Sequence, residues 1–351
     1  MENLQIEWLQ IIWFILWGVL WGVYFMLDGY DFGISMWLPI LGASSEKERT
    51  AMYQVTGPFW DGNEVWLITA GGVTFAAFPI AYAVLFSSLY TPLLILLFCL
   101  IIRGVVFELR FQVVHRYYRM ICDGLGCLTS AVAAILLGVA FSNLFRGLPL
   151  VYDADKQFSM FQGNILNLLH PYCILGGVLF LLIFLVHGAL YLTYRVEGDL
   201  KTKAFYMAKV TWPIFLIVFL VYVAFTFFWA FWPRLGDNFL ASPLLFALPA
   251  LCAVLFLATG YYMYFKNSPG RAFLASCGGI LTLTLTGVIG MFPNLIPSRI
   301  DPKGAMNLVN SSSSNPTLTI MLVVAVIMVP TVIIYQIWAH KKMAWTIKAD
   351  Y

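Results

Sequence analysis

Long apolar segments alternate with short polar ones along the whole chain. A helix that crosses a membrane needs about 20 mainly apolar residues, and nine segments reach that length between boundaries set by Pro, Gly or charge. We therefore predict an all-α polytopic membrane protein with a single integral membrane domain over 1–351. The expected spans lie near 8–38, 57–79, 81–107, 120–145, 165–193, 206–232, 243–265, 272–293 and 317–340.

The composition agrees with this pattern and excludes a soluble fold. Of the 351 residues, 61% are hydrophobic and 11% are charged, whereas soluble domains carry about 25% charged residues. The net charge of +3 comes from dispersed basic residues, so nucleic acid is not an expected partner. The six cysteines form no CxxC pair. We interpret them as packing residues, with no disulfide framework and no iron–sulfur or zinc site.

The distribution of Lys and Arg predicts the orientation in the membrane. Nine spans place the two termini on opposite sides. With the N-terminus outside, fifteen of the 20 Lys and Arg residues lie on the inner side. Cytoplasmic loops of membrane proteins are enriched in these residues. We therefore expect the N-terminus outside and the C-terminus inside.

The first span carries two pairs of glycines, and the members of each pair are four residues apart. They are Gly18, Gly22, Gly29 and Gly33. These glycines share a stripe about 60° wide on a helix that turns by about 100° per residue. Such a stripe lets a second helix approach closely. We expect tight packing here, and we predict that the early helices contact a partner subunit. Packing among helices of this chain is the competing interpretation.

Ionisable residues inside the spans are the main candidates for chemistry, because an acid at the centre of a membrane costs at least about 2.5 kcal/mol. Three consecutive spans carry such residues near their inner ends: Asp28 and Asp31, then Asp61 and Glu64, then Arg103 and Glu108. Acids three residues apart share one side of a helix. We expect four carboxylates and one guanidinium to gather there, with Glu108 below them. Such a cluster can hold protons, because neighbouring carboxylates favour one another's protonated form.

Asp61 has the most specific surroundings of these acids. Pro58 before it can open a helix, and Gly62 after it leaves space beside the backbone. A helix break inside a membrane protein is tolerated where it is buried or lines a cavity. The competing interpretation for the whole group is a set of interfacial ion pairs that close the helix bundle.

The histidines argue against a haem held by this chain alone. Only His170 and His187 lie within a predicted span. They are separated by about 25 Å along one helix and lie on different faces, so they cannot bind one haem from two sides. Either can serve as a single axial ligand, although a structural imidazole explains each of them better. His115 and His340 lie at the inner interface. Redox cofactors are therefore expected mainly on a partner.

Several stretches of the sequence resemble subunit II of the cytochrome bd quinol oxidases. They are 28–33 (DGYDFG), 57–79 (GPFWDGNEVWLITAGGVTFAAFP), 103–108 (RGVVFE), 187–192 (HGALYL) and 310–319 (NSSSSNPTLT). The resemblance runs from the first span to the ninth. It implies nine helices, arranged as two four-helix bundles and one peripheral helix, in a prokaryotic cytoplasmic (inner) membrane.

The resemblance also implies an activity and partners. Subunit I of this family holds two b-type haems and one d-type haem, or a third b-type haem in its place, and it oxidises the quinol. The heterodimer passes electrons from quinol to dioxygen, makes water and takes up the protons from the inside. This chain is expected to act only as a subunit, in contact with lipid and quinone. The resemblance leaves open a small accessory subunit.

The resemblance assigns roles to two of the acids. It places Asp61 on a proton route toward the oxygen-reducing haem and Asp28 further along that route. Structural support would explain the others equally well, and they are possible supports of the route: Asp31, Glu64, Arg103 and Glu108. Two other functions remain open. A proton-coupled secondary transporter would use membrane acids to carry its coupling ion, and a scaffold for subunit I would use them only for packing.

Overall fold

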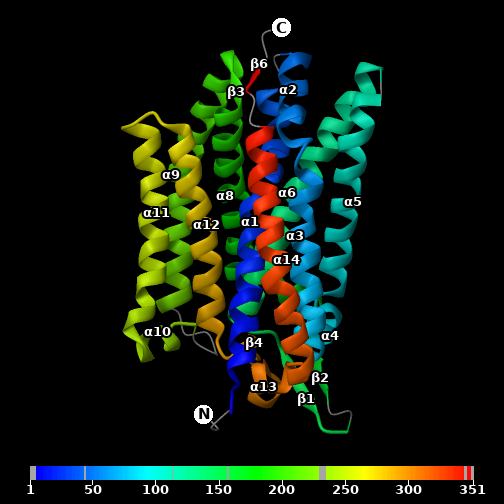
Figure 1. The fold of residues 1–351 in the computed structure, drawn as a ribbon, viewed down its shortest axis with the longest axis vertical. Helices are drawn as coiled ribbons and strands as arrows, with labels where there is room; N and C mark the ends of the chain where they lie inside the picture. The colour runs from blue at the N-terminus through cyan, green and yellow to red at the C-terminus, as the bar shows by residue number, and fades with distance from the viewer. Residues whose placement is uncertain are drawn as a thin grey trace.

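The computed structural model describes residues 5–42, 45–112, 114–155, 158–228, 235–343 and 346–348. Figure 1 shows long helices lying side by side along the longest axis of the molecule. Among the described residues, eight helices are long and apolar enough to cross a membrane. They are α1 (Trp8–Leu41), α5 (Tyr90–Gln112), α6 (Arg116–Arg146), α8 (Pro171–Arg195), α9 (Gly198–Phe228), α11 (Ala247–Tyr264), α12 (Pro269–Met291) and α14 (Asn315–Lys342). The predicted all-α membrane fold is confirmed.

The second predicted span, 57–79, corresponds to α3 (Trp60–Ala77), which is not one of these eight helices. Its first turns carry Asp61, Asn63 and Glu64, and these residues make it less apolar than the others. A helix of 18 residues is about 27 Å long, slightly shorter than a hydrocarbon core of about 30 Å. Eight strongly apolar helices and one shorter, more polar helix thus correspond to the nine predicted spans.

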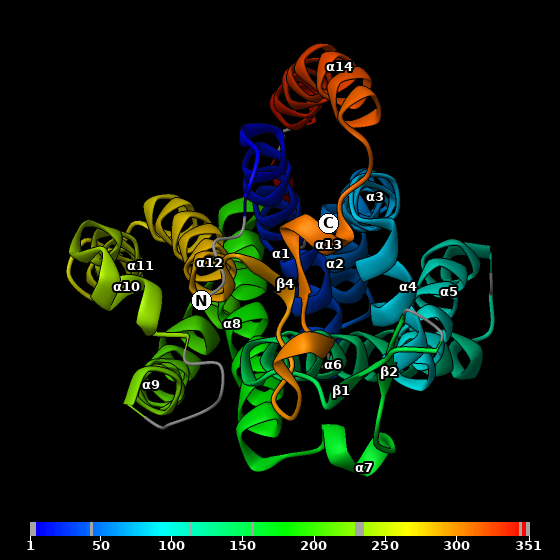
Figure 2. The ribbon, with the colours of Figure 1, turned by 90° about the horizontal axis from the view of Figure 1, so that it is seen from below.

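The third predicted span, 81–107, begins too early. Residues up to Ser88 form a separate helix, α4 (Pro79–Ser88), and α5 begins only at Tyr90. The backbone of Phe78 is not helical (φ −133°, ψ 60°), because a residue that precedes proline disfavours the helical region. Leu89 interrupts the helix again. Figures 1 and 2 show α4 leading from the lower end of α3 to the lower end of α5.

Two further boundaries differ from the prediction. The fifth span was expected from 165, but residues 165–168 form the short helix α7 (Ile165–Leu168), and α8 begins at Pro171. The sixth span was expected from 206, whereas α9 begins at Gly198. The first turns of α9 carry charged side chains and lie before the apolar segment, so a search for apolar stretches does not detect them. The predicted end of this span, near 232, lies outside the described residues.

The long helices of the described residues form two four-helix bundles and one peripheral helix, as the resemblance implied. The first bundle contains α1, α3, α5 and α6, and the second contains α8, α9, α11 and α12. Both α1 and α6 pack against α8, and α1 also contacts α12. Figure 2 shows α14 outside both bundles, and only 6% of its most apolar stretch is buried. Thus α1 belongs to the contact between the bundles, and α14 is peripheral.

The glycine stripe of α1 packs against helices of this chain. A Cβ atom on Gly33 would lie 2.0 Å from the backbone oxygen of Phe184 and 2.8 Å from the Cα of Gly188. The other three glycines face side chains of α8 or α12: Gly29 faces Phe184, Gly22 faces Leu281 and Gly18 faces Val288. The prediction of tight packing is confirmed. The prediction that this stripe serves contact with a partner is wrong, because α1 uses it to join the two bundles.

Short elements cover the end of the molecule where α1 begins. They are the antiparallel pairs β1 (Leu150–Asp153) with β2 (Phe158–Phe161) and β4 (Asn294–Ile296) with β5 (Met306–Asn307), together with α10 (Asp237–Ala241), α13 (Leu308–Ser311), η1 (Pro243–Phe246) and η2 (Pro302–Gly304). The polar segment 310–316 leads from this cap into α14, and Pro316 lies in the first turn of that helix. Ser313 donates hydrogen bonds to the carbonyls of Ala76 and Ala77.

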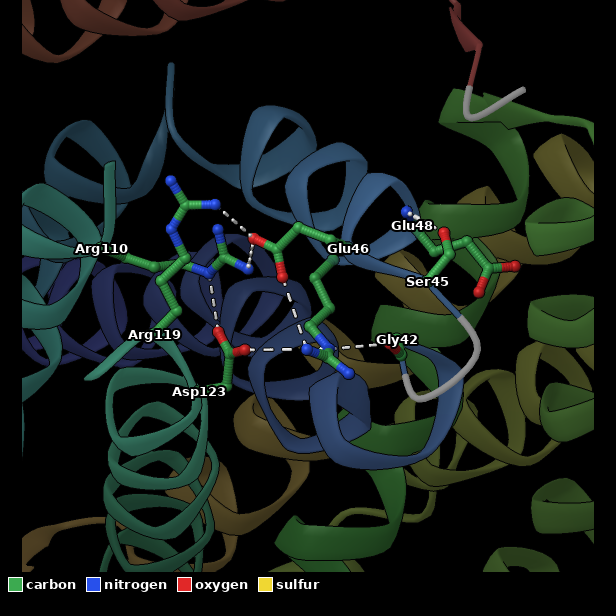
Figure 3. A network of polar contacts seen from close by, with 8 residues as sticks. Gly42, Ser45, Glu46, Glu48, Arg110, Arg119 and Asp123 are labelled. Carbon is green, nitrogen blue, oxygen red and sulfur yellow. Dashed lines mark hydrogen bonds and ion pairs between the residues drawn. The ribbon is translucent and has the colours of Figure 1, made fainter. Parts of the chain in front are cut away.

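Charged side chains around α2 (Glu46–Thr56) hold the opposite end together (Figure 3). Glu46 accepts hydrogen bonds from Arg110 at 2.8 Å and from Arg119 at 3.1 Å. Asp123 accepts one from Arg110 at 2.7 Å, and Arg49 forms an ion pair with Glu46 at 3.4 Å. This network ties α2, which the sequence did not predict, to α5 and α6.

The chain returns to the same end after α14. The strand β3 (Val196–Glu197) pairs in parallel with β6 (Ile347–Lys348), and Arg195 donates a hydrogen bond to the carbonyl of Met343. We call this end of the molecule the β6 end. In Figure 1, α1 begins at the end opposite to it.

Candidate functional site

Asp28 and Arg103 form a fully buried ion pair between α1 and α5. Nη1 of Arg103 donates to Oδ2 of Asp28 at 3.1 Å, and Nη2 donates to Oδ1. The two side chains are at most 1% exposed, and the ring of Phe32 lies 4.3 Å from the guanidinium carbon. A charge buried this deeply requires a partner, so each residue fixes the other.

Asp31, one turn away from Asp28, is held by an amide. Nδ2 of Asn63 on α3 donates to Oδ2 of Asp31 at 2.7 Å and to the hydroxyl of Tyr30 at 2.6 Å. All three side chains are buried. Oδ1 of Asp31, Oδ1 of Asn63 and Nε of Arg103 form no hydrogen bond to any described residue. These atoms remain available to internal water, which binds where buried polar groups lack partners.

The peripheral helix α14 contacts this site from outside. Nε2 of Gln336 donates to the carbonyl of Gly62 at 3.1 Å, and Nε2 of His340 lies 3.3 Å from the hydroxyl of Tyr30. The imidazole also stacks on the ring of Phe59, with the ring centroids 4.2 Å apart. The polar side chains of α14 therefore reach the acid site, although most of the helix faces outward.

Asp61 lies at the start of α3, and its side chain is exposed. Its Oδ1 accepts a hydrogen bond from the backbone N–H of Gly62 at 2.7 Å, and a carboxylate at this position stabilises a helix N-terminus. Pro58 lies in the turn that follows Thr56, between α2 and α3, so the break precedes the span instead of opening it. There is space beside Gly62 as predicted: a Cβ atom added there would lie 3.9 Å from Nε2 of Gln336.

Glu64 lies one turn further into α3 and is half-buried. It interacts electrostatically with Arg103, Asp28 and Asp61. Glu108 is exposed on α5, and in the described part of the chain no hydrogen bond or ion pair joins it to the other acids. The structure therefore brings together Asp28, Asp31, Asp61, Glu64 and Arg103, and it leaves Glu108 outside this acid site.

The ring of His187 does not fit a haem site. Its Nδ1 faces the hydroxyl of Ser276 at 2.6 Å, and its Nε2 faces the carbonyl of Met26 at 2.9 Å. Both ring nitrogens are therefore engaged, and iron would have to displace one of these bonds. The residue instead joins α8 to α1 and α12 in the buried contact between the bundles.

His170, which the sequence placed within a span, lies just before α8. Its Nδ1 accepts a hydrogen bond from the backbone N–H of Tyr172 at 3.2 Å. Burial, together with the nearby guanidinium groups of Arg146 and Arg299, lowers the pKa of His170 below its ordinary value. The ring is therefore neutral at pH 7, as its role as an acceptor at the helix N-terminus requires.

An apolar cavity of about 940 Å³ lies beside α3, α4, α5 and α6. Nearer the β6 end, α3 and α5 are in contact, since the ring of Trp60 stacks on that of Phe107 with the ring centroids 5.4 Å apart. Gly71 and Gly72 of α3 line the cavity, and a Cβ atom on either would meet nothing within 4 Å. A cavity of this size suits part of a lipid acyl chain or an isoprenoid chain.

Sequence reasoning missed three residues of the acid site: Tyr30, Asn63 and His340. The first two stand inside the stretches 28–33 and 57–79, beside the acids. An amide in an apolar helix is itself a signal, because a buried polar group needs a partner. No sequence pattern pointed to His340, since its contact with Tyr30 joins residues 310 positions apart.

Comparisons with known proteins agree with this architecture. A family model described as cytochrome bd terminal oxidase subunit II matches residues 9–343. The cytochrome bd ubiquinol oxidase subunit 2 of Bacillus subtilis (strain 168) is 34% identical over 334 residues, which cover 94% of each chain. The cytochrome bd-I ubiquinol oxidase subunit 2 of Escherichia coli (strain K12) is 32% identical over 366 residues, which cover 96% of this chain and 94% of that protein.

A solved structure of the bd oxidase from Geobacillus thermodenitrificans has a similar fold. Its TM-score is 0.76 at 15% sequence identity, and the match covers 95% of this chain and 97% of the chain compared. None of these matches supports the secondary transporter. The chain belongs to the family of cytochrome bd terminal oxidase subunit II, and it is a membrane subunit of an oxygen-reducing quinol oxidase.

Proposed function

We propose that this chain pairs with haem-bearing subunit I and supplies protons for oxygen reduction along a route from Asp61 to Asp28. Quinol, the substrate of the complex, delivers the electrons, and the formation of water from dioxygen consumes protons as well as electrons. In this proposal the protons come from the inner side of the membrane, at the β6 end. Most Lys and Arg residues belong to that end, which favours a cytoplasmic location for it.

The increasing burial of the acids supports this route most directly. Asp61 is exposed, Glu64 is half-buried and Asp28 is fully buried. Asp61 and Glu64 are three residues apart on one side of α3, and Glu64 interacts electrostatically with both of the other acids. A proton taken up at Asp61 would therefore have one intermediate acid before it reaches the buried ion pair.

The remaining polar atoms support the same route. Arg103 stabilises the ionised form of Asp28, so that carboxyl would release a proton as well as accept one. Oδ1 of Asp31 and Oδ1 of Asn63 lack partners among the described residues, and water bound there would bridge gaps between the acids. Glu108 has no role in this route, because it lies outside the acid site.

We place subunit I against the exposed face of α3. Asp61, Val65, Ile68 and Phe75 are all exposed there, at spacings that keep them on one side of the helix. A carboxylate that faces lipid is unfavourable. A protein partner that covers this stripe would enclose Asp61 and connect the route to the oxygen-reducing haem.

The cofactors follow from the same proposal. In this proposal subunit I carries the haems, two of b type and one of d type or a third of b type. The ring nitrogens of His187 are engaged, which supports an absence of iron at that residue. The apolar cavity beside α3 and α5 holds the acyl chain of a lipid or the isoprenoid tail of a quinone. The complex lies in a prokaryotic inner membrane with the N-terminus of this chain outside.

The test is the variant Asp61→Asn in the complete two-subunit complex. Asparagine preserves the shape of the side chain but cannot carry a proton, so we expect oxygen consumption to fall about tenfold or more, as for loss of a proton-transfer group. Haem content and the yield of complex should stay nearly unchanged. The matched control is Asp199→Asn, because Asp199 is 86% exposed at the same end of the molecule.

Two outcomes would contradict the proposal in different ways. Normal oxygen consumption by the Asp61→Asn complex in proteoliposomes would remove Asp61 from the proton route. Loss of haem together with activity would instead indicate that Asp61 serves the contact with subunit I. Glu64→Gln should give a smaller loss of turnover, because internal water can bypass an intermediate acid more easily than an entry point.

A further inference from the structure

The two polar side chains that α14 directs at the acid site differ in what they contact. Gln336 binds the backbone of α3 at Gly62, which holds the helix in place. His340 meets Tyr30, a buried side chain that is one hydrogen bond from Asn63 and two from Asp31. Only His340 is therefore connected through side chains to a buried acid.

The hydrogen-bond partner of each group determines which atom of this connection carries a hydrogen. Nδ1 of His340 lies 2.8 Å from the carbonyl oxygen of Gln336, which only accepts, so Nδ1 carries a hydrogen. Nε2 of the neutral ring then accepts the hydroxyl hydrogen of Tyr30. The oxygen of Tyr30 accepts one N–H of Asn63, and the other N–H of that amide is donated to Asp31. Each donor in this chain of four side chains has an acceptor.

Asn63 prevents protons from passing between Tyr30 and Asp31. A group that relays protons accepts a hydrogen on one side and donates one on the other. The same atom of Asn63 meets both Tyr30 and Asp31, so the amide donates to both of them. If the amide were turned round, it would accept from both. Neither orientation lets a proton pass from Tyr30 to Asp31.

We infer that His340 is a positioning residue for Asp31, acting through Tyr30 and Asn63, and that it does not relay protons. The peripheral helix α14 thereby completes the acid site. This inference deepens the proton route proposed above and depends on that route only for its effect on turnover. The position of Asp31 itself can be measured whether or not the route is correct.

The test compares three variants in the complete two-subunit complex. His340→Leu removes the imidazole that accepts from the hydroxyl of Tyr30, while the hydroxyl of Tyr191 stays beside it. His340→Gln supplies a carbonyl acceptor but cannot carry a proton. Gln336→Leu removes the other polar contact of α14 and leaves the side-chain connection intact, so it is the matched control. Haem content and complex yield are measured for each.

We expect His340→Leu to lower turnover roughly two- to tenfold, the equivalent of one neutral hydrogen bond. His340→Gln should restore turnover to near the wild-type rate, and Gln336→Leu should leave it unchanged. Equal losses with Leu and Gln would overturn the inference, because a carbonyl acceptor would then fail to restore turnover. Wild-type turnover with Leu, or an equal loss with Gln336→Leu, would also overturn it.

Redox-induced infrared difference spectra test the position of Asp31 independently of turnover. The carboxyl band that disappears in Asp31→Asn belongs to that residue, and His340→Leu should shift it whereas Gln336→Leu should not. Tyr30→Phe removes only the hydroxyl and should shift the same band, which provides a second test if His340→Leu does not assemble. If Asp61→Asn alone keeps normal turnover, the proposed route fails, but a shift of the Asp31 band still supports the role of His340.

Discussion

The ion pair of Asp28 and Arg103 is not explained by stability alone. Removing two charges from water is costly, and apolar residues of similar size often stabilise a buried site equally well. The pair nevertheless occupies the contact between α1 and α5, with both side chains almost completely buried. The proton route proposed above would give this buried acid a function that an apolar residue cannot supply.

Breaking this pair should be more harmful than removing it. Arg103→Met leaves Asp28 buried without a cation, so the complex should lose about 3–5 kcal/mol of stability. Arg103→Met combined with Asp28→Leu should recover much of that loss. Thermal unfolding of the purified complex measures both variants, with the exposed Arg116→Met as the control. A double variant no more stable than Arg103→Met would argue against a charge-based coupling.

The sequence predicted the charged residues of the site better than the neutral ones. Asp28 and Arg103 could be found because a charge in an apolar segment always needs an explanation. Tyr30 and Asn63 could not be paired, since their hydrogen bond depends on how α1 and α3 are rotated about their axes. The contact with His340 depends in addition on the placement of α14, which forms few contacts of its own.

Among the helices, α1 has the central position because its small residues allow contact with both bundles. At its crossing with α8, the backbones of Gly33 and Gly188 approach so closely that neither position has room for a methyl group. This crossing lies two residues beyond Asp31 along α1, so the packing of the bundles also sets the depth of the acid site.

Gly33→Ala should therefore destabilise the complex. The added methyl group would meet backbone atoms that cannot move aside, and overpacking of this kind costs about 1–3 kcal/mol. The control is Gly71→Ala, which adds a methyl group where the cavity leaves space and should be neutral or slightly stabilising. Thermal unfolding and haem content of the two complexes are compared. Equal stability would show that the crossing can open to admit the methyl group.

Helix positions were predictable from hydropathy, whereas helix ends were not. The apolar residues of α4 and α5 read as one continuous segment, yet Phe78 and Leu89 interrupt the helix on either side of α4. Hydropathy did not reveal α2, because this helix is polar. It is stabilised by a cap at Ser45 and by ion pairs with α5 and α6. Such polar contacts, local or long-range, cannot be predicted from mean hydropathy.

The two ends of the whole molecule differ in chemistry, and this difference predicts its orientation. Short strands and helices cover one end, whereas the β6 end has the network of Arg and Glu around α2 (Figure 3). Val114 is 89% exposed between α5 and α6 at the β6 end, and Lys303 is exposed in η2 at the opposite end. These two positions are suitable for chemical labelling.

Single cysteines at these positions should label from opposite sides of the membrane. We expect Lys303→Cys to react with a membrane-impermeant maleimide in spheroplasts with an intact inner membrane and Val114→Cys to react only after lysis. The native cysteines are buried or half-buried, so their labelling should be weak, and the wild-type protein measures it. The reverse pattern would invert the topology and would move the entrance of the proton route to the other side.

Because α14 follows both bundles in the sequence, it is synthesised after them and contacts the acid site late. Tyr30 enters the membrane early, but His340, its partner, is made 310 residues later. During that interval Tyr30 and the first turn of α3 have no contact with the last helix. A chain truncated before α14 would lack the contacts of His340 and Gln336, so its acid site would remain incomplete.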